Sequence, residues 1–130
     1  MNIIDHIGLR VSNYGRARQF YERALAPLGI SVVMEVKAEK SGGYQGSGFG
    51  RNGKPSFWLE GGARTAPHTH IAFVADSRAD VDSFHKAALA AGGQDNGGPG
   101  IRSQYHPSYY GAFVLDPDGH NIEAVCHRPE

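Results

Sequence analysis

The chain has 130 residues, which is the size of one compact domain able to bury its own core. Hydrophobic residues make up 40% and charged residues 20%, so the composition is that of a globular protein and not of a disordered chain. The 13 Lys and Arg residues balance the 13 Asp and Glu residues, and no apolar run approaches the roughly 18 residues that span a bilayer, which argues against nucleic-acid and membrane partners.

The first half of the sequence predicts a strand, a helix and three further strands. Residues 3–11 alternate with the period of two that is typical of a strand. Ser12 or Asn13 can cap a helix, and Pro27 and Gly29 mark its end. The apolar positions of this helix are spaced as one helical face: Ala17, Phe20, Tyr21, Ala24, Leu25 and Leu28. The three strands that follow are predicted over Ile30–Glu39, Tyr44–Arg51 and Ser56–Glu60.

The second half repeats this order. A strand is predicted over His68–Ala75, and Ser77 can cap a helix whose apolar face ends before Gly92-Gly93. The two last strands are predicted over Tyr109–Leu115 and Asn121–Cys126, separated by a type I turn at Asp116–Gly119. The least defined strand lies between residues 93 and 105, where glycine dominates.

An ungapped internal repeat supports this organisation. The stretch that begins Asp5-His6-Ile7 matches the stretch that begins Thr69-His70-Ile71, 64 residues later. The match continues at Phe20 and Phe84, Ala24 and Ala88, Leu25 and Leu89, and Gly29 and Gly93. Each unit is too small to bury a sheet face alone, so we expect one α+β domain over residues 1–130, with units 1–62 and 67–130 packed together, helices outside and two sheets curling around a cleft.

Strand alternation selects the candidate chemical residues. His6 lies on the strand face that carries Gly8, and His70 lies on the face that carries Ala72, so small neighbours leave room for a ligand. Glu123, in an apolar strand, needs a partner because an unpaired buried carboxylate is costly. Two imidazoles and one carboxylate that converge on a cleft would form a facial triad for Fe, Mn, Ni or Zn. The alternative for each histidine is an ordinary hydrogen-bonded structural residue.

With these residues, the chain resembles members of the vicinal oxygen chelate superfamily, which includes glyoxalase I, extradiol dioxygenases, and fosfomycin- and bleomycin-resistance proteins. The resemblance covers nearly the whole chain, and four stretches mark it: Asp5–Val11, Phe20-Tyr21, His70–Phe73 and Asp116–Glu123. It implies paired βαβββ modules and a divalent metal in the cleft. It maps His6, His70 and Glu123 onto metal-ligand positions.

The chain departs from this pattern at the last strand of the first module. The superfamily takes a further ligand from this strand, but the ungapped repeat pairs Glu123 with Leu59. Trp58 and Glu60 share the opposite face, so Trp58 can fill the ligand position and leave Glu60 at the strand end. Glu60 is then either a solvated carboxylate or, if it faces the cleft, a fourth ligand or a general base.

A second group of polar and aromatic residues lies before the last two strands. It suits a planar or anionic substrate, and its members are Arg102, Tyr105, His106, Tyr109 and Tyr110. Tyr110 or His106 could also donate a proton. The alternative is an aromatic loop that packs on the core or on a second subunit.

Two further stretches receive structural interpretations. The glycines of Gly46–Gly50 open no helix, so they are expected to let strands curve or approach closely and not to bind a dinucleotide. Cys126 faces away from Glu123 and is expected to be a small buried side chain. One cysteine excludes an intrachain disulfide and, with no signal-peptide pattern at the start of the sequence, favours the cytoplasm.

The leading hypothesis is therefore a small glyoxalase-like enzyme that depends on Ni, Zn, Mn or Fe. It would act on a small molecule with adjacent oxygens as an isomerase, a lyase or a dioxygenase, with Glu60 and Glu123 as catalytic carboxylates. The rival hypothesis is a metal-free small-molecule-binding protein of the bleomycin-resistance type, in which Trp58 and the tyrosines stack on the bound molecule. The resemblance also implies a homodimer.

Overall fold

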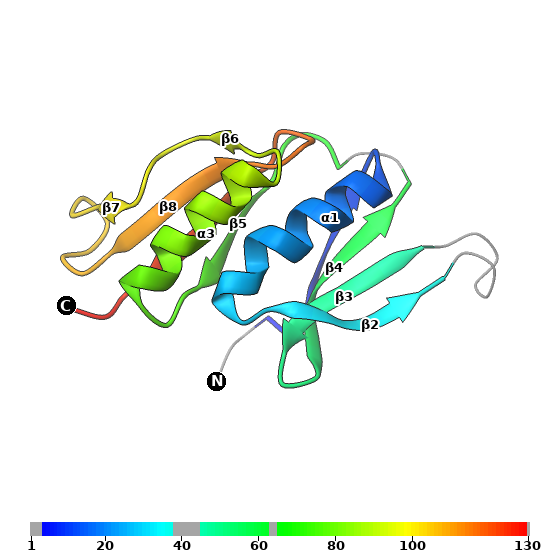
Figure 1. The fold of residues 1–130 in the computed structure, drawn as a ribbon, viewed down its shortest axis with the longest axis horizontal. Helices are drawn as coiled ribbons and strands as arrows, with labels where there is room; N and C mark the ends of the chain where they lie inside the picture. Colours follow the sequence, from blue (N-terminus) through cyan, green and yellow to red (C-terminus); the bar gives the residue numbers. More distant parts are fainter. Residues whose placement is uncertain (1–3, 38–44, 63–64, 130) are drawn as a thin grey trace.

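The computed structural model describes residues 4–37, 45–62 and 65–129, and the predicted strand ends at Glu39 and Tyr44 lie outside them. The predicted α+β fold is confirmed, with two mixed sheets that do not close (Figure 1). The first module contains β1 (Ile7–Val11), α1 (Tyr14–Leu25), the 3-10 turn η1 (Ala26–Leu28), β2 (Ser31–Val36), β3 (Gly46–Arg51) and β4 (Lys54–Gly61). The second contains β5 (His70–Val74), α3 (Arg78–Ala90), β6 (Gln94–Asp95), β7 (Gly100–Ile101), β8 (Tyr110–Leu115) and β9 (Asn121–Cys126).

The two sheets have equivalent topologies. The first has the order β1-β4-β3-β2 and the second the order β5-β9-β8-β6, with β7 also paired to β8. In both sheets the first strand of the module is an end strand that runs parallel to the last strand, β1 beside β4 and β5 beside β9. The repeat in the sequence is therefore a repeat in the structure. Among the described residues, no helix is long and apolar enough to span a membrane.

The predicted helix caps are present. The Asn13 side chain accepts a hydrogen bond from the backbone N–H of Arg16 at 3.0 Å, and Ser77 accepts one from Asp80 at 3.1 Å. After η1, Gly29 adopts a φ of 75°, a left-handed conformation that glycine adopts without strain. These local signals fix where α1 and α3 begin and where the first helical segment ends.

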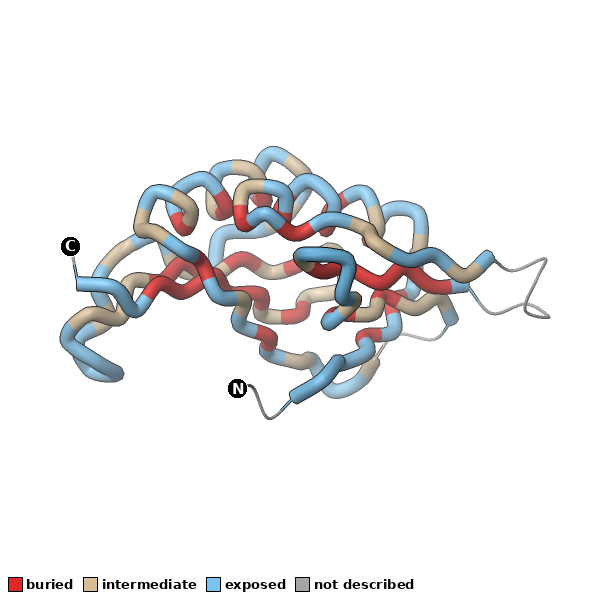
Figure 2. The backbone as a smooth tube through the Cα atoms, turned by 90° about the horizontal axis from the view of Figure 1, so that it is seen from below, coloured by how far each residue is buried: buried red, intermediate tan, exposed pale blue. Residues whose placement is uncertain are grey.

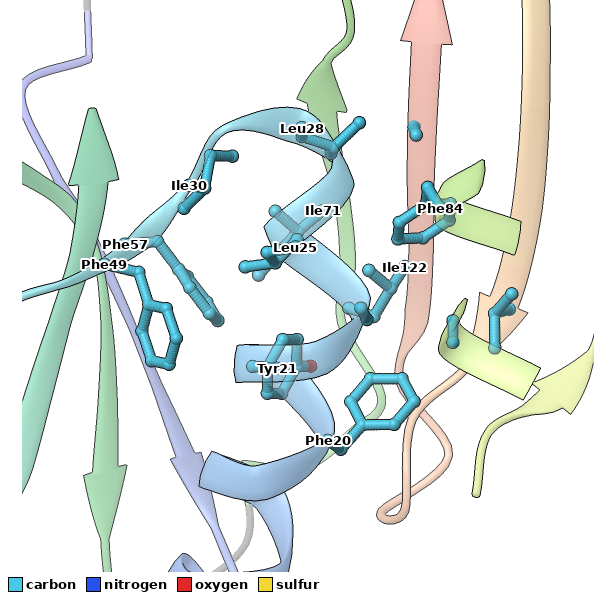
Figure 3. Close-up of a cluster of buried hydrophobic side chains, with 14 of the residues drawn as sticks. Phe20, Tyr21, Leu25, Leu28, Ile30, Phe49, Phe57, Ile71, Phe84 and Ile122 are labelled. Atoms are coloured by element: carbon cyan, nitrogen blue, oxygen red, sulfur yellow. The ribbon is translucent and has the colours of Figure 1, made fainter. Parts of the chain in front are cut away.

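The core joins both modules through the helices. Figure 3 shows α1 in the middle, with Phe49 and Phe57 of the first sheet on one side and Phe84 and Ile122 of the second module on the other. Figure 2 shows buried residues on the sides of the helices that face the strands and along the strands themselves. Cys126 on β9 is buried, as predicted. The helices are thus the common layer on which both sheets are held.

Tyr21 forms a polar contact inside this core. Its side chain is completely buried, and its O–H donates to Asp116 at 2.5 Å. The other oxygen of Asp116 accepts the backbone N–H groups of Asp118 and His120. Burial, followed by the charge of Asp116, raises the pKa of Tyr21 well above its usual value of 10.0. The contact ties α1 to the turn before β9.

Substituting Tyr21 with phenylalanine should destabilise the protein by about 1.5–3 kcal/mol at pH 7, because a hydrogen bond to a charged group is lost. The wild type should also lose stability as the pH rises above 10.0, since the unfolded chain releases the Tyr21 proton there while the folded chain retains it. Tyr21→Phe has no such proton to release, so the difference in unfolding free energy between wild type and this variant should become smaller above pH 10.0. Urea unfolding followed by circular dichroism at several pH values measures both effects.

Tyr105 offers a matched control, because its side chain is 63% exposed and its ring lies outside the core. Tyr105→Phe should leave stability within about 0.5 kcal/mol of wild type. A constant free-energy difference between wild type and Tyr21→Phe from pH 7 to pH 11 would contradict the role given to Tyr21.

Candidate active site

The second module brings two of the predicted residues together. Glu123 of β9 pairs in register with Ala72 of β5, and His70 lies two residues earlier on the same face. The distance between His70 Nε2 and Glu123 Oε1 is 2.8 Å. The Glu123 side chain is 1% exposed, and its second oxygen accepts a hydrogen bond from the Tyr109 hydroxyl. The buried carboxylate therefore has the partners that its environment requires.

His6 has a different neighbourhood. Its Nδ1 lies 2.8 Å from the Asp5 carboxylate, which also forms an ion pair with Lys54 at 2.9 Å. The hydrogen bond with His6, followed by that with Lys54, lowers the pKa of Asp5. Because an ionised carboxylate can only accept, Nδ1 of His6 donates this hydrogen bond, and Nε2 is the ring nitrogen left for a metal. His6 is thus oriented in the way that metal-binding histidines are held by a carboxylate.

The sheet register decides which residue matches Glu123 in the first module. Trp58 pairs with Gly8, two residues after His6, just as Glu123 pairs with Ala72, two residues after His70. The ungapped sequence alignment, which pairs Glu123 with Leu59, is therefore displaced by one residue. An indole side chain stands where the second module has a carboxylate.

Glycines accommodate the two large side chains on this face. A Cβ on Gly48 would lie 3.0 Å from the Trp58 ring, and a Cβ on Gly8 would lie 3.4 Å from the Glu60 carboxylate. Glu60 also forms an ion pair with Arg10 at 3.9 Å. The absence of a side chain at Gly8 and Gly48 lets Trp58 and Glu60 lie close to the sheet.

Two cavities lie beside these residues. The first has a volume of about 480 Å³ and is lined by His6, Gly8, Val36, Trp58 and Glu60. The second, here called the β5 cavity, has a volume of about 550 Å³ and is lined by all five residues of β5, including His70. Within residues 4–37, 45–62 and 65–129, no group of three or more His, Cys, Asp or Glu side chains is placed to hold a metal ion. The structure therefore brings His70 to Glu123 but not His6 to that pair.

Part of the predicted aromatic group gathers near Glu123. The Tyr105 ring lies 5.0 Å from the Tyr109 ring, whose hydroxyl reaches Glu123. The Arg102 guanidinium lies 5.4 Å from the ring of Phe113. Phe113 is on β8 and pairs with Glu123 of β9. Arg102 also donates to the carbonyls of Gly98 and Gly100, so it holds the glycine-rich loop in place.

The other two members of the group lie elsewhere. His106 packs against His127, with ring centroids 5.7 Å apart. The Tyr110 hydroxyl donates to Asp82 of α3 at 2.6 Å, and Arg78 of the same helix lies over its ring. Successive residues of a strand point to opposite faces, so Tyr110 lies on the helix side of the sheet while Tyr109 reaches Glu123.

His120 is a supporting residue that the sequence reasoning did not identify. It is completely buried, and its Nδ1 accepts the backbone N–H of Thr69, the residue before His70. Its Nε2 has no hydrogen-bond partner among the described residues. The available signal was strand alternation, which puts His120 on the core face with Ile122. Its contact fixes the start of β5 and hence the position of His70.

Comparisons with known proteins agree with this architecture. The model of the Glyoxalase/Bleomycin resistance protein/Dioxygenase superfamily matches residues 3–124. A glyoxalase/bleomycin resistance protein from Albidiferax ferrireducens T118 is 26% identical, with a TM-score of 0.76 and coverage of 96% of this chain and 99% of that one. A domain from Frankia sp. EAN1pec described as glyoxylase/bleomycin resistance protein/dioxygenase is 18% identical, with a TM-score of 0.72 and coverage of 98% and 99%.

Glyoxalase I from Zea mays also shares the fold. It is 20% identical, with a TM-score of 0.67, and the match covers 98% of this chain but 45% of the maize chain. No curated protein matches the chain significantly.

Proposed function

Since the chain belongs to the Glyoxalase/Bleomycin resistance protein/Dioxygenase superfamily, we propose that it is a divalent-metal-dependent enzyme acting on a small molecule with adjacent oxygens. The observation that carries the proposal is the 2.8 Å separation of His70 Nε2 and Glu123 Oε1. Two ligands at right angles, each about 2.1 Å from one ion, lie about 3 Å apart, so this pair has the spacing of neighbouring metal ligands.

The partners of the proposed ligands also fit a metal. Asp5 holds Nδ1 of His6, and Tyr109 holds the second oxygen of Glu123, which are the outer contacts that orient metal ligands. His6, His70 and Glu123 would bind the ion, and the proposal requires His6 to reach the pair when the metal is present. A bound divalent ion would polarise the adjacent oxygens of the substrate as a Lewis acid, in an isomerase, lyase or dioxygenase reaction.

The surrounding side chains would bind and orient the substrate. Tyr105 and Trp58 offer aromatic faces on which a planar molecule can stack. Arg102 is held by two carbonyls beside the ring of Phe113, the residue that pairs with Glu123, and would supply a positive charge to an anionic substrate. Glu60 lines the same cavity as His6, so we propose its carboxylate as the general base.

Metal analysis of purified protein tests this proposal. After incubation with Ni²⁺, Mn²⁺, Fe²⁺ or Zn²⁺, the wild type should retain one ion per chain, whereas His6→Ala and His70→Ala should retain little. His85→Ala is a control, because His85 lies on α3 and pairs with Asp95. A wild type that binds none of the four metals would reject metal dependence, and full metal content in His6→Ala would remove His6 from the ligand set.

A metal-free binding protein is the second candidate, and the position of Trp58 favours it. An indole occupies the place that matches Glu123, so the first module supplies no carboxylate there. Trp58, which lines the cavity beside His6, would then stack on the bound molecule. Trp58 is the only tryptophan in the chain, so its fluorescence should change when a ligand binds to metal-free protein.

We also propose a homodimer, on the basis of the family. Sedimentation equilibrium should then give a mass near twice the 14.0 kDa of the chain. A monomeric species across the concentration range would reject the dimer.

A further inference from the structure

The β5 cavity has mainly apolar walls. Its volume of about 550 Å³ is in the range of sites that enclose a small organic molecule. The first module contributes Ile7, Phe49 and Phe57 to the walls, and β5 contributes Ile71, Phe73 and Val74. Figure 3 shows Phe49 and Phe57 side by side within the buried cluster. Ile7 and Val74 remain 39% and 60% exposed, so the cavity has an apolar opening to solvent.

Arg51 lines the same cavity and is fixed by the backbone. Its Nε donates to the Leu28 carbonyl at 2.9 Å, and its Nη2 donates to the Val74 carbonyl at 2.6 Å. A guanidinium has five N–H groups, so three are left over. Across the described residues, Arg51 forms no ion pair with a carboxylate. An immobilised positive charge, with no carboxylate counter-ion among residues 4–37, 45–62 and 65–129, therefore lies against an apolar wall.

The opposite end of the cavity carries the proposed metal ligand His70. The cavity follows β5 from His70 to Val74, the residue whose carbonyl binds Arg51. Four residue steps along a strand span about 13 Å. The two polar ends are thus separated by roughly the length of a phenylalkyl chain, and the wall between them is mostly apolar.

We propose that the β5 cavity binds a small amphipathic carboxylate, with the acid group on Arg51 and the apolar body lying along β5 toward His70. A carboxylate matches the planar guanidinium fork, and one negative charge balances the one positive charge available. The apolar walls favour an aromatic or aliphatic body over a sugar or a nucleotide. The claim that such a carboxylate is the substrate of the enzyme rests on the proposed function. The claim that the cavity binds it does not.

Isothermal titration calorimetry with two probes of the same shape tests the site. Metal-free protein should bind 4-phenylbutanoate at least tenfold more tightly than the uncharged 4-phenylbutan-1-ol. Arg51→Gln should reduce the affinity for the acid to that for the alcohol. Arg23→Gln changes the net charge equally on the exposed side of α1 and should preserve the preference. Ser56→Trp fills the cavity and should abolish binding of both probes.

Several outcomes would overturn the proposal. They are equal affinities for the two probes in wild type, no binding of either probe, or a preference for the acid that survives in Arg51→Gln. The wild-type comparison and Ser56→Trp decide the matter even if Arg51→Gln does not fold. Metal analysis of the same wild-type sample separates the two claims, because protein that binds the acid but no metal keeps the site and rejects the metal-dependent enzyme.

Discussion

Replacing Glu123 with glutamine should reduce metal affinity by more than about 100-fold while the protein keeps its fold. The amide has nearly the same shape, and its oxygen can still accept a hydrogen bond from Tyr109 or His70. It carries no negative charge, however, and is a poor ligand for a divalent ion. Loss of an outer partner typically costs about 10–100-fold, so Tyr109→Phe should have a smaller effect than Glu123→Gln.

A competition titration against a coloured chelator measures these affinities, and circular dichroism monitors the fold. Glu22 provides the control, because it is an exposed carboxylate on α1 paired with Arg18 at 3.3 Å. Glu22→Gln should bind metal like wild type. Wild-type affinity in Glu123→Gln would show that Glu123 is a structural partner of Tyr109 and His70 and not a ligand.

Substituting Gly50 with alanine should be the most destructive single change in the first sheet. A Cβ at this position would lie 1.8 Å from the carbonyl oxygen of Lys54 and 3.2 Å from the Cα of Pro55. Both contacts are with the backbone of the neighbouring strand, at a register shift between β3 and β4. The strands cannot separate without losing their hydrogen bonds, so we expect a loss of about 4 kcal/mol or more.

Alanine substitutions at two other glycines provide a comparison for the stability loss expected at Gly50. A Cβ on Gly98 meets nothing within 4 Å, so Gly98→Ala should lie within about 0.5 kcal/mol of wild type. A Cβ on Gly48 would lie 2.7 Å from the Cβ of Pro55 and 3.0 Å from the Trp58 ring, which are less severe contacts than the one at Gly50, so the effect of Gly48→Ala should be intermediate. Urea unfolding midpoints and soluble yield rank the stabilities of the three glycine variants. A Gly50→Ala protein that unfolds at the wild-type urea concentration would contradict the close approach of the two strands.

Features set by local pattern could be predicted from the sequence. The strand Asn121–Cys126 has the predicted bounds, and Asn13 and Ser77 cap the two helices as expected. The interpretation of Gly46–Gly50 as a place of close approach is also confirmed. Strand alternation and caps act over a few residues, and the repeat supplied the order of the elements.

Features set by register and tertiary contact could not be predicted in this way. Strand alternation left both Trp58 and Glu60 open for the position that matches Glu123, and only the register of β1 with β4 decides for Trp58. The segment between residues 93 and 105 has no periodic pattern. It is held by β8, where Phe113 exchanges hydrogen bonds with Asn96 and Gly97. Its two short strands, β6 and β7, therefore depend on pairing with β8, a strand outside the segment.

The burial of Cys126 gives the protein a native reporter of its own opening. It is the only cysteine in the chain, and its side chain is inaccessible within the second sheet. A thiol reagent can react only with molecules in which this part of the sheet has opened. When closing is faster than the chemistry, the labelling rate measures the equilibrium population of open molecules. Every variant that retains Cys126 can thus be compared by thiol labelling in the absence of denaturant, without an introduced probe.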